Sequence, residues 1–281
     1  MACAAWRRGR KHDGEWVAYL PLRRLRRHLP LAGEDQGALP LARAMRPRHN
    51  AAVTKRIYRH RLFTRIWHWI NALAILILIP SGLMIFNAHP RLYWGQYGAN
   101  FDHAWLELPR FPGWVTIPSH YSLAGARHWH LFFALVLGFG LLAYMLFGLI
   151  SRHIQRDLRI RGAELAPRHL AADFKAHLAL RFHDPANPGA YNIFQKASYA
   201  GVIFVLLPLL IASGLAISPG MWPWLADLFG GRQSARSVHF IAMVCTTLFI
   251  VVHLTLVILA GPINEVRSMV TGWWRVPEDP S

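Results

Sequence analysis

The chain has 281 residues, of which 54% are hydrophobic and only 16% charged, a composition that excludes a disordered or fibrous protein. Lys and Arg number 31 against 14 Asp and Glu, but long uncharged apolar runs beside this excess of positive charge argue against a nucleic-acid-binding protein. The two cysteines, Cys3 and Cys245, are too few for a disulfide framework or a cysteine-built iron–sulfur cluster.

The first 55 residues are rich in Arg and show no clean helical or strand period. We expect them to form a disordered cytoplasmic extension. The segment that begins at Met45 would make a natural start, which leaves open whether residues 1–44 belong to the native protein or are an upstream extension of the reading frame. No apolar stretch precedes Ile66, and we therefore expect no signal peptide.

Four later stretches are long enough to cross a bilayer, which takes about 20 apolar residues. Asp, Glu, Lys and Arg are almost absent from them, and buried helices of soluble proteins rarely run so long without charge. The sequence therefore predicts an all-α, integral membrane four-helix bundle within residues 56–275, followed by a tail at 276–281. The expected spans are about 66–86, 129–150, 198–217 and 238–260.

The basic residues predict the orientation of these spans. Of the 31 Lys and Arg, 26 lie before the first span, between the second and third, or after the fourth, and only 5 lie in the other two connections. By the positive-inside rule, both termini face the cytoplasm. The connection at 87–126 then lies outside, and a loop of this length is typical of a functional or docking surface.

The first and third spans share a short motif, as do the second and fourth. The sequence "PSGLMIF" at 80–86 matches "ASGLAIS" at 212–218, and both "RHWH" at 127–130 and "RSVH" at 236–239 fit the pattern R-x-x-H. These matches indicate a duplicated helix pair. The alignment pairs the last histidine of the first R-x-x-H segment, His130, with the histidine of the second.

Histidines inside the spans are the main functional signal, because an ionisable residue within a membrane helix is by default a functional hypothesis. His239 and His253 are fourteen residues apart on the fourth span, so they share a face but lie about 21 Å apart along the axis. One metal ion cannot use both. His68 on the first span and His130 on the second lie at complementary depths, provided that the first span is tilted or begins early.

Two bis-imidazole pairs follow, His68 with His253 on the inner side and His130 with His239 on the outer side. Such pairs in the core of a four-helix bundle suit two b-type haems. Zinc would need its ligands closer together, and the absence of C-x-x-C-H excludes covalent haem attachment. His128 stays open as an alternative ligand from the second span.

Two arginines, Arg127 and Arg236, each precede an outer ligand by three residues. They are candidates to pair with haem propionates, and the alternative is an ordinary interfacial role.

Five segments resemble the bacterial cytochrome b561 and nickel–iron hydrogenase cytochrome b group, which includes the membrane subunits of periplasmic formate dehydrogenase and of thiosulfate reductase-like enzymes. The resemblance covers residues 56–275 and is greatest to the thiosulfate reductase cytochrome b branch. The segments are "RIWHWINALAILILIPSGLMIF", "RHWHLFFA", "AYNIFQKASY", "RSVHF…VVHLT" and "NEVRSMVTGWW".

This resemblance implies a di-haem subunit of the bacterial inner membrane that passes electrons between a periplasmic catalytic partner, of the molybdenum or nickel–iron type, and the quinone pool. It implies the same four histidines as ligands of the haem iron. It also places Asn192, Gln195 and Lys196 by the quinone pocket, with helix capping and headgroup contact as the alternative.

Two other functions stay open. One is a self-sufficient oxidoreductase that reacts with a small diffusible donor at the outer haem. The other is a proton-coupled transporter with a histidine relay, which predicts no haem and expects broken spans; Pro208 in the third span is one such feature. The sequence leaves the partner, the direction of electron flow and the quinone type undetermined.

Overall fold

A computed structural model describes residues 56–152, 160, 162–178, 193–218 and 222–276. Within the chain, 52–281 forms one compact unit. The expected extension at 1–55, most of the tail and the quinone candidate Asn192 lie outside the described residues.

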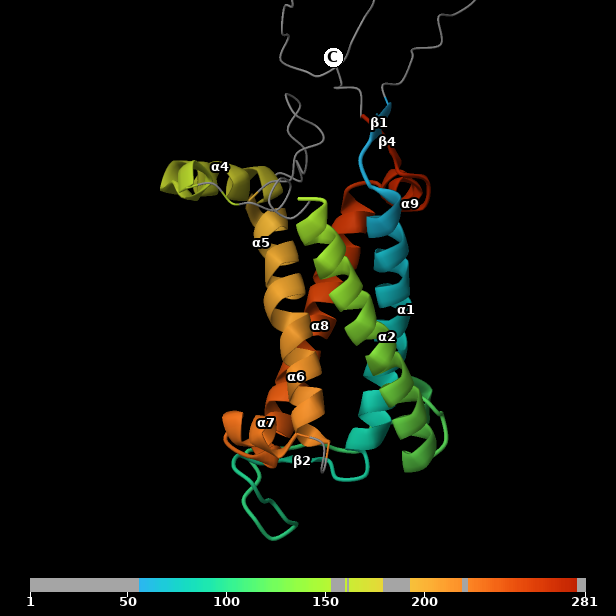
Figure 1. Cartoon of the computed structure of the whole chain (residues 1–281), viewed down its shortest axis with the longest axis vertical. Helices are drawn as coiled ribbons and strands as arrows, with labels where there is room; N and C mark the ends of the chain where they lie inside the picture. Colours follow the sequence, from blue (N-terminus) through green and yellow to red (C-terminus); the bar gives the residue numbers. More distant parts are fainter. Residues whose placement is uncertain (1–55, 153–159, 161, 179–192, 219–221, 277–281) are drawn as a thin grey trace, which may run out of the picture. The chain divides into compact units, whose positions relative to one another are not determined.

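Four long helical segments form the bundle (Figure 1). Each is long and apolar enough to cross a membrane, and each begins four to six residues before the apolar stretch that predicted it. Apolar composition marks the part of a helix that fits the hydrocarbon layer, whereas the helix itself continues into polar residues beyond it. The segments are α1 (Leu62–Phe86), α2 (Leu123–Ile150), the third span built from α5 (Ile193–Gly201), η3 (Val202–Leu206) and α6 (Leu207–Ile217), and α8 (Arg232–Leu259).

The third span is regular except at η3, which is a π-helical turn. Pro208 follows directly in the first turn of α6. Proline has no backbone N–H, so the preceding turn loses a helical hydrogen bond there. A π-turn beside the proline keeps the span continuous while changing the register of its backbone hydrogen bonds.

Helix packing follows the predicted duplication. The most extensive contacts join α1 to α2 and α6 to α8. The buried core lies where α1, α2 and the third span meet, and it consists of Ala74, Leu137, Leu141, Tyr144, Ile203 and Leu207.

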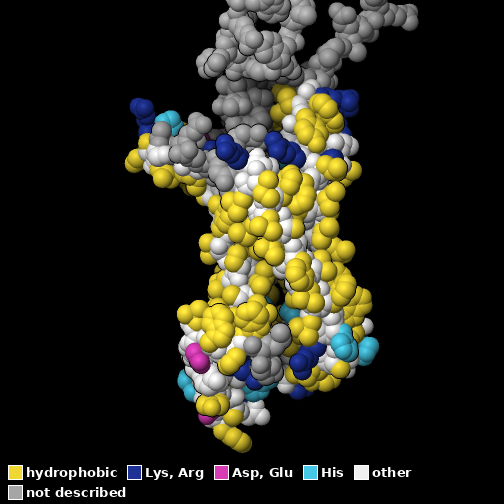
Figure 2. Space-filling model, in the orientation of Figure 1, with side chains coloured by type: hydrophobic (Ala, Val, Ile, Leu, Met, Phe, Trp, Pro, Cys, Tyr) yellow, Lys and Arg dark blue, Asp and Glu magenta, His cyan; other side chains and the backbone are white. Residues whose placement is uncertain are grey.

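The outward faces of the helices remain apolar. Leu76, Phe139, Val205 and Leu248, one from each span, are 62–68% exposed. Figure 2 shows hydrophobic side chains over the middle of the bundle and Lys and Arg toward its ends. A soluble monomer rarely exposes so much contiguous apolar surface, so this surface fits a lipid environment.

Short elements cover both ends of the bundle, including two antiparallel strand pairs that the sequence did not predict. We call the two ends the α7 end and the α9 end. The α7 end carries β2 (Arg91–Leu92), β3 (Leu106–Glu107), the 3-10 turn η1 (Gly113–Val115) and α7 (Pro223–Leu228). The α9 end carries β1 (Arg56–Tyr58), η2 (Gly162–Leu165), α4 (Pro167–Leu178), α9 (Pro262–Thr271) and β4 (Trp273–Arg275).

At the α7 end, the loop after α1 caps the start of α8. The carbonyl oxygen of Gly95 accepts hydrogen bonds from the backbone N–H groups of Gln233 and Ser234, at 3.0 and 3.1 Å. These N–H groups have no partner within their own helix. Gly231 precedes them with a φ of +114° and approaches Gly95 so closely that a Cβ would lie 2.5 Å from it. The loop and helix α8, which carries His239 and His253, are therefore held together.

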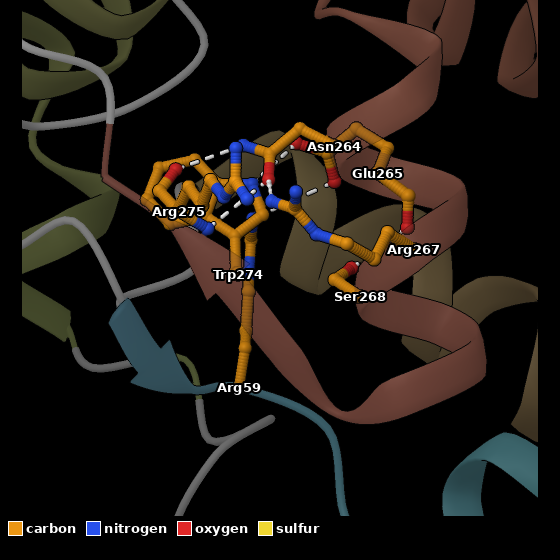
Figure 3. Close-up of polar contacts among 7 residues, drawn as sticks. All are labelled: Arg59, Asn264, Glu265, Arg267, Ser268, Trp274 and Arg275. Atoms are coloured by element: carbon orange, nitrogen blue, oxygen red, sulfur yellow. Dashed lines mark hydrogen bonds and ion pairs between the residues drawn. The ribbon is translucent and has the colours of Figure 1, made fainter. Parts of the chain in front are cut away.

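At the α9 end, a polar cluster ties the segment before α1, at Arg59, to α9 and β4 (Figure 3). Arg59 pairs with Glu265 at 3.6 Å, and both side chains are largely buried. The fully buried Trp274 donates from Nε1 to the same carboxylate at 2.8 Å. The side chain of Asn264 bonds both the N–H and the carbonyl of Arg275, which joins α9 to β4.

The start of α1 is fastened to α9 as well. Arg65 donates to the carbonyl of Val270 at 2.6 Å, and the indole N–H of Trp69 donates to the carbonyl of Met269 at 3.0 Å. His68 lies between these two side chains in sequence. The helical turn that carries His68 is therefore fixed against α9.

Candidate functional site

The structure brings together four of the predicted histidines as two pairs, both of which involve α8. At the α9 end, the ring centroids of His68 on α1 and His253 lie 6.3 Å apart. At the α7 end, those of His130 on α2 and His239 lie 6.1 Å apart. Two imidazoles on opposite sides of one metal ion, each with a metal–nitrogen distance of about 2 Å, have centroids about 6 Å apart. Both pairs therefore have the spacing of axial ligands.

Hydrogen bonds define the tautomer of His130. Its Nδ1 lies 3.1 Å from the carbonyl oxygen of Leu78 and 3.1 Å from Oγ of Ser81. The serine hydroxyl donates its own hydrogen to the carbonyl of Ile77 at 2.7 Å, so it accepts from the ring. A carbonyl can only accept. Nδ1 therefore carries the hydrogen, and Nε2 keeps the lone pair that a metal requires.

His239 has the same arrangement in the second helix pair. Oγ of Ser213 lies 3.0 Å from its Nδ1 and donates to the carbonyl of Leu209 at 2.6 Å. The carbonyl of Leu210 is the second acceptor. The two helix pairs thus hold their histidines by equivalent contacts.

The glycine after each serine provides space for the ring. A Cβ on Gly82 would lie 3.2 Å from Cε1 of His130, and one on Gly214 would lie 3.3 Å from Cε1 of His239. From the sequence, the repeated Ser-Gly-Leu motif served only to align the two halves, and the role of its serine and glycine was missed. The signal in the sequence was that the same Ser-Gly dipeptide occurs in the first and third spans, and that an R-x-x-H histidine begins the span after each of them.

The α9-end pair is held differently. Nδ1 of His68 is buried without a hydrogen-bond partner, and within the described part of the chain no hydrogen bond reaches the ring nitrogens of His253. Packing orients these rings instead, with Phe249 stacked on His253 at 5.8 Å.

His128 lies apart from both pairs. It is exposed on α2 and lines a shallow surface depression with Trp129 and Phe132. The structure therefore brings His130, and not His128, beside His239.

The two arginines proposed for propionates occupy different surroundings. Arg127 is exposed and makes no hydrogen bond to the described residues. Arg236 donates to the backbone carbonyls of His89 and Arg91, and it lies 5.6 Å from the ring of Phe86. Arg236 thus connects α8 to the loop after α1, a contact that the sequence did not predict.

Of the three quinone candidates, Gln195 and Lys196 lie in the first turn of α5, at the α9 end (Figure 1). This end also carries His68 and His253.

The donor set fits haem better than a bare metal ion. No group of three or more His, Cys, Asp or Glu side chains that could hold a metal ion occurs among the residues that the structure describes. A pair of histidines leaves most coordination positions to be filled from elsewhere, and the four nitrogens of a porphyrin fill them.

Comparison with known proteins decides the family. The model of the prokaryotic cytochrome b561 family matches residues 59–272, which include all four paired histidines. The chain belongs to the prokaryotic cytochrome b561 family. It is therefore a membrane b-type cytochrome, for which the family implies b-type haem, and the resemblance found in the sequence is confirmed. Family membership and the four apolar helices together indicate a multi-pass protein of the inner membrane.

Several curated proteins are similar over most of their length. A putative protein-methionine-sulfoxide reductase subunit, YedZ1, from Azospira oryzae is 29% identical over 74% of this chain and 94% of its own. A probable Ni/Fe-hydrogenase B-type cytochrome subunit from Cupriavidus necator is 23% identical over 86% of this chain and 92% of its own. The putative cytochrome YdhU from Escherichia coli is 28% identical over 79% of this chain and 76% of its own. No solved structure matches the chain.

Proposed function

We propose that this chain is a di-haem electron-transfer subunit that connects a catalytic partner on the periplasmic side with the quinone pool. The observation that carries the proposal is the presence of two histidine pairs, with centroid separations of 6.1 and 6.3 Å, at opposite ends of α8. His130 and His239 would hold one haem and His68 and His253 the other. When bound, each haem iron takes up and releases one electron.

The α7 end is the proposed periplasmic side. Most Lys and Arg lie in the segments that precede α1, follow α2 and follow α8, and the positive-inside rule assigns these segments to the cytoplasm. The loop at 87–122 then faces the partner. It presents exposed aromatic side chains, with Tyr97 and Trp114 both 85% exposed, and aromatic residues are frequent anchors of protein interfaces.

The relatives favour a catalytic partner over a self-sufficient oxidoreductase. YedZ1 and the hydrogenase cytochromes are named as subunits, and we propose that this chain is likewise a subunit rather than the catalytic component. The type of partner enzyme, molybdenum or nickel–iron, stays open.

The α9 end is the proposed site of quinone exchange. Gln195 carries an amide and Lys196 an ammonium group, and either could hydrogen-bond a quinone carbonyl. Asn192 completes the proposed set by sequence position.

The first test is a count of haem in the full-length chain. The protein is purified from membranes, and pyridine haemochrome and reduced-minus-oxidised spectra are recorded per chain. Two b-type haems are expected. One haem would mean that one pair is assigned wrongly, whereas a folded, fully loaded preparation without haem would leave the histidine-relay transporter as the better reading. Quinone reduction by the isolated chain with a soluble donor would favour the self-sufficient enzyme.

A further inference from the structure

We propose that Ser81 and Ser213 are positioning residues that set the redox preference of the α7-end haem separately from that of the α9-end haem. The inference rests on the proposed function, because it concerns the haem held by His130 and His239. Its basis is a pair of contacts, 3.1 Å from Ser81 Oγ to His130 Nδ1 and 3.0 Å from Ser213 Oγ to His239 Nδ1.

The two contacts arise independently in the two helix pairs. Ser81 on α1 approaches His130 on α2, and Ser213 on α6 approaches His239 on α8. Both serines are fully buried. A buried serine in a helix commonly bonds only the carbonyl one turn before it, and here each does so while also meeting an imidazole on the neighbouring helix. The repetition of this arrangement on both sides of one site favours a role at that site.

The direction of each hydrogen bond gives the chemistry. Ser81 donates to the carbonyl of Ile77 and Ser213 donates to that of Leu209, so each hydroxyl oxygen is an acceptor for the imidazole N–H. An acceptor at Nδ1–H fixes ring orientation and increases the basicity of the nitrogen that binds the metal. A more basic ligand stabilises ferric over ferrous iron. The two serines therefore lower the midpoint potential of the α7-end haem.

The α9-end pair provides an internal reference. Nδ1 of His68 is buried without a hydrogen-bond partner, and neither Ser81 nor Ser213 contacts His68 or His253 in the described structure. A change at either serine should therefore act on one haem of the two.

The test uses the variants Ser81→Ala, Ser213→Ala and the double variant in the full-length, haem-loaded protein. Optical redox titration resolves the two haems, and electron paramagnetic resonance reports the ligand field of each ferric iron. The α7-end component is assigned as the one lost in His239→Ala. Ser237→Ala is the matched control, because Ser237 is fully buried two residues before His239 but bonds Tyr93 and Trp105 instead.

We expect the double variant to raise the midpoint of the α7-end haem alone. Loss of a hydrogen-bond partner of a metal-bound histidine typically lowers metal affinity by about tenfold or more. A tenfold loss confined to the ferric state corresponds to about 59 mV for one electron. Each single variant should shift less, since the serine against the other histidine of the pair remains. Ser81→Thr, which keeps the hydroxyl, should restore the wild-type value relative to Ser81→Ala.

The outcomes separate the two proposals. Wild-type protein without haem contradicts the proposed function itself. Two haems in the wild type, with both midpoints unchanged in the double variant, overturn the role of the serines and leave the function intact. Selective loss of the α7-end haem in the serine variants, with both haems retained in Ser237→Ala, supports the role. Equal loss of both haems in the serine variants and the control shows a merely structural effect and overturns it.

Discussion

The ring of His68 lies 6.3 Å from that of His253, between centroids, and this contact joins the first long helix to the last at the α9 end of the bundle. His253 shares α8 with His239, whose ring lies 6.1 Å from that of His130. Helix α8 therefore takes part in both pairs, and each pair draws its second member from a different helix.

Removing one histidine should empty one site. We expect His68→Ala and His253→Ala each to leave one haem per chain, the one at the α7 end. We expect His130→Ala and His239→Ala each to leave only the haem at the α9 end. Among the described residues, no third His, Cys, Asp or Glu joins either pair to take the place of a removed histidine. Pyridine haemochrome quantification per chain measures the loss.

The control for these variants is His128→Ala, because His128 is exposed beside Trp129 and Phe132. It should keep two haems. Loss of a haem in His128→Ala together with its retention in His130→Ala would contradict the pairing.

Adding a methyl group at Gly82 or Gly214 should disturb the α7-end site. The new Cβ would lie 3.2 or 3.3 Å from Cε1 of the facing histidine, so the ring must move by a few tenths of an ångström. We expect haem at that site to be lost about tenfold faster to an acceptor protein, in line with changes around metal-bound histidines. Gly138→Ala on α2 is the control, since a Cβ there meets nothing within 4 Å; equal rates in all three variants would contradict the prediction.

Arg236→Gln should loosen the loop after α1 from α8. The guanidinium donates to two backbone carbonyls, those of His89 and Arg91, and hydrogen bonds from a charged group contribute about 1.5–3 kcal/mol each. We expect a loss of about 3 kcal/mol or more in unfolding free energy and faster proteolysis within 87–122. Arg127→Gln, at an exposed arginine, should unfold and digest like the wild type. An unchanged digestion pattern in Arg236→Gln would refute this role.

Glu265→Gln should destabilise the α9 end. Arg59 is 5% exposed and Glu265 17% exposed, and removing one partner of a buried ion pair costs about 3–5 kcal/mol. We expect a lower thermal midpoint, followed by circular dichroism in detergent. Glu107→Gln removes the exposed pair with Arg91 at 2.8 Å, a kind of contact that contributes about 0–1 kcal/mol. Similar midpoints for the two variants would show that the buried pair contributes little.

His89 should make the α7 end sensitive to acid. Burial, with further contributions from Arg236 and Arg91, holds the pKa of His89 below its ordinary value. The folded chain therefore binds fewer protons at this residue than the unfolded chain does. The contribution to stability is complete above about pH 6.5 and is lost as the pH falls toward the lowered pKa.

We expect His89→Gln to show a smaller fall in thermal midpoint than the wild type between about pH 7.5 and about pH 5. His120→Gln, at an exposed histidine of the same loop, should follow the wild type. Parallel curves for His89→Gln and the wild type would count against the contribution of His89.

Much of the bundle could be predicted from the sequence, because its signals are local. Long apolar runs identify the four spans, and the fourteen-residue spacing of His239 and His253 places both on one face of α8 at different depths. The repeated R-x-x-H pattern selected His130 as the partner of His239, and the structure brings these two rings together. The short strand pairs were not predicted, because their few residues pair through contacts between separate parts of the chain.

The sequence by itself determined the number of apolar helices, the excess of positive charge on one set of connections, and which histidines share a depth, since each depends only on composition and helical periodicity. Only the tertiary structure decided what surrounds those histidines. Ser81 lies against His130, Gly82 leaves room for its ring, and Arg236 is bound by the loop rather than free beside the site. These relationships depend on how neighbouring helices are rotated against one another, and rotation is set by packing between them.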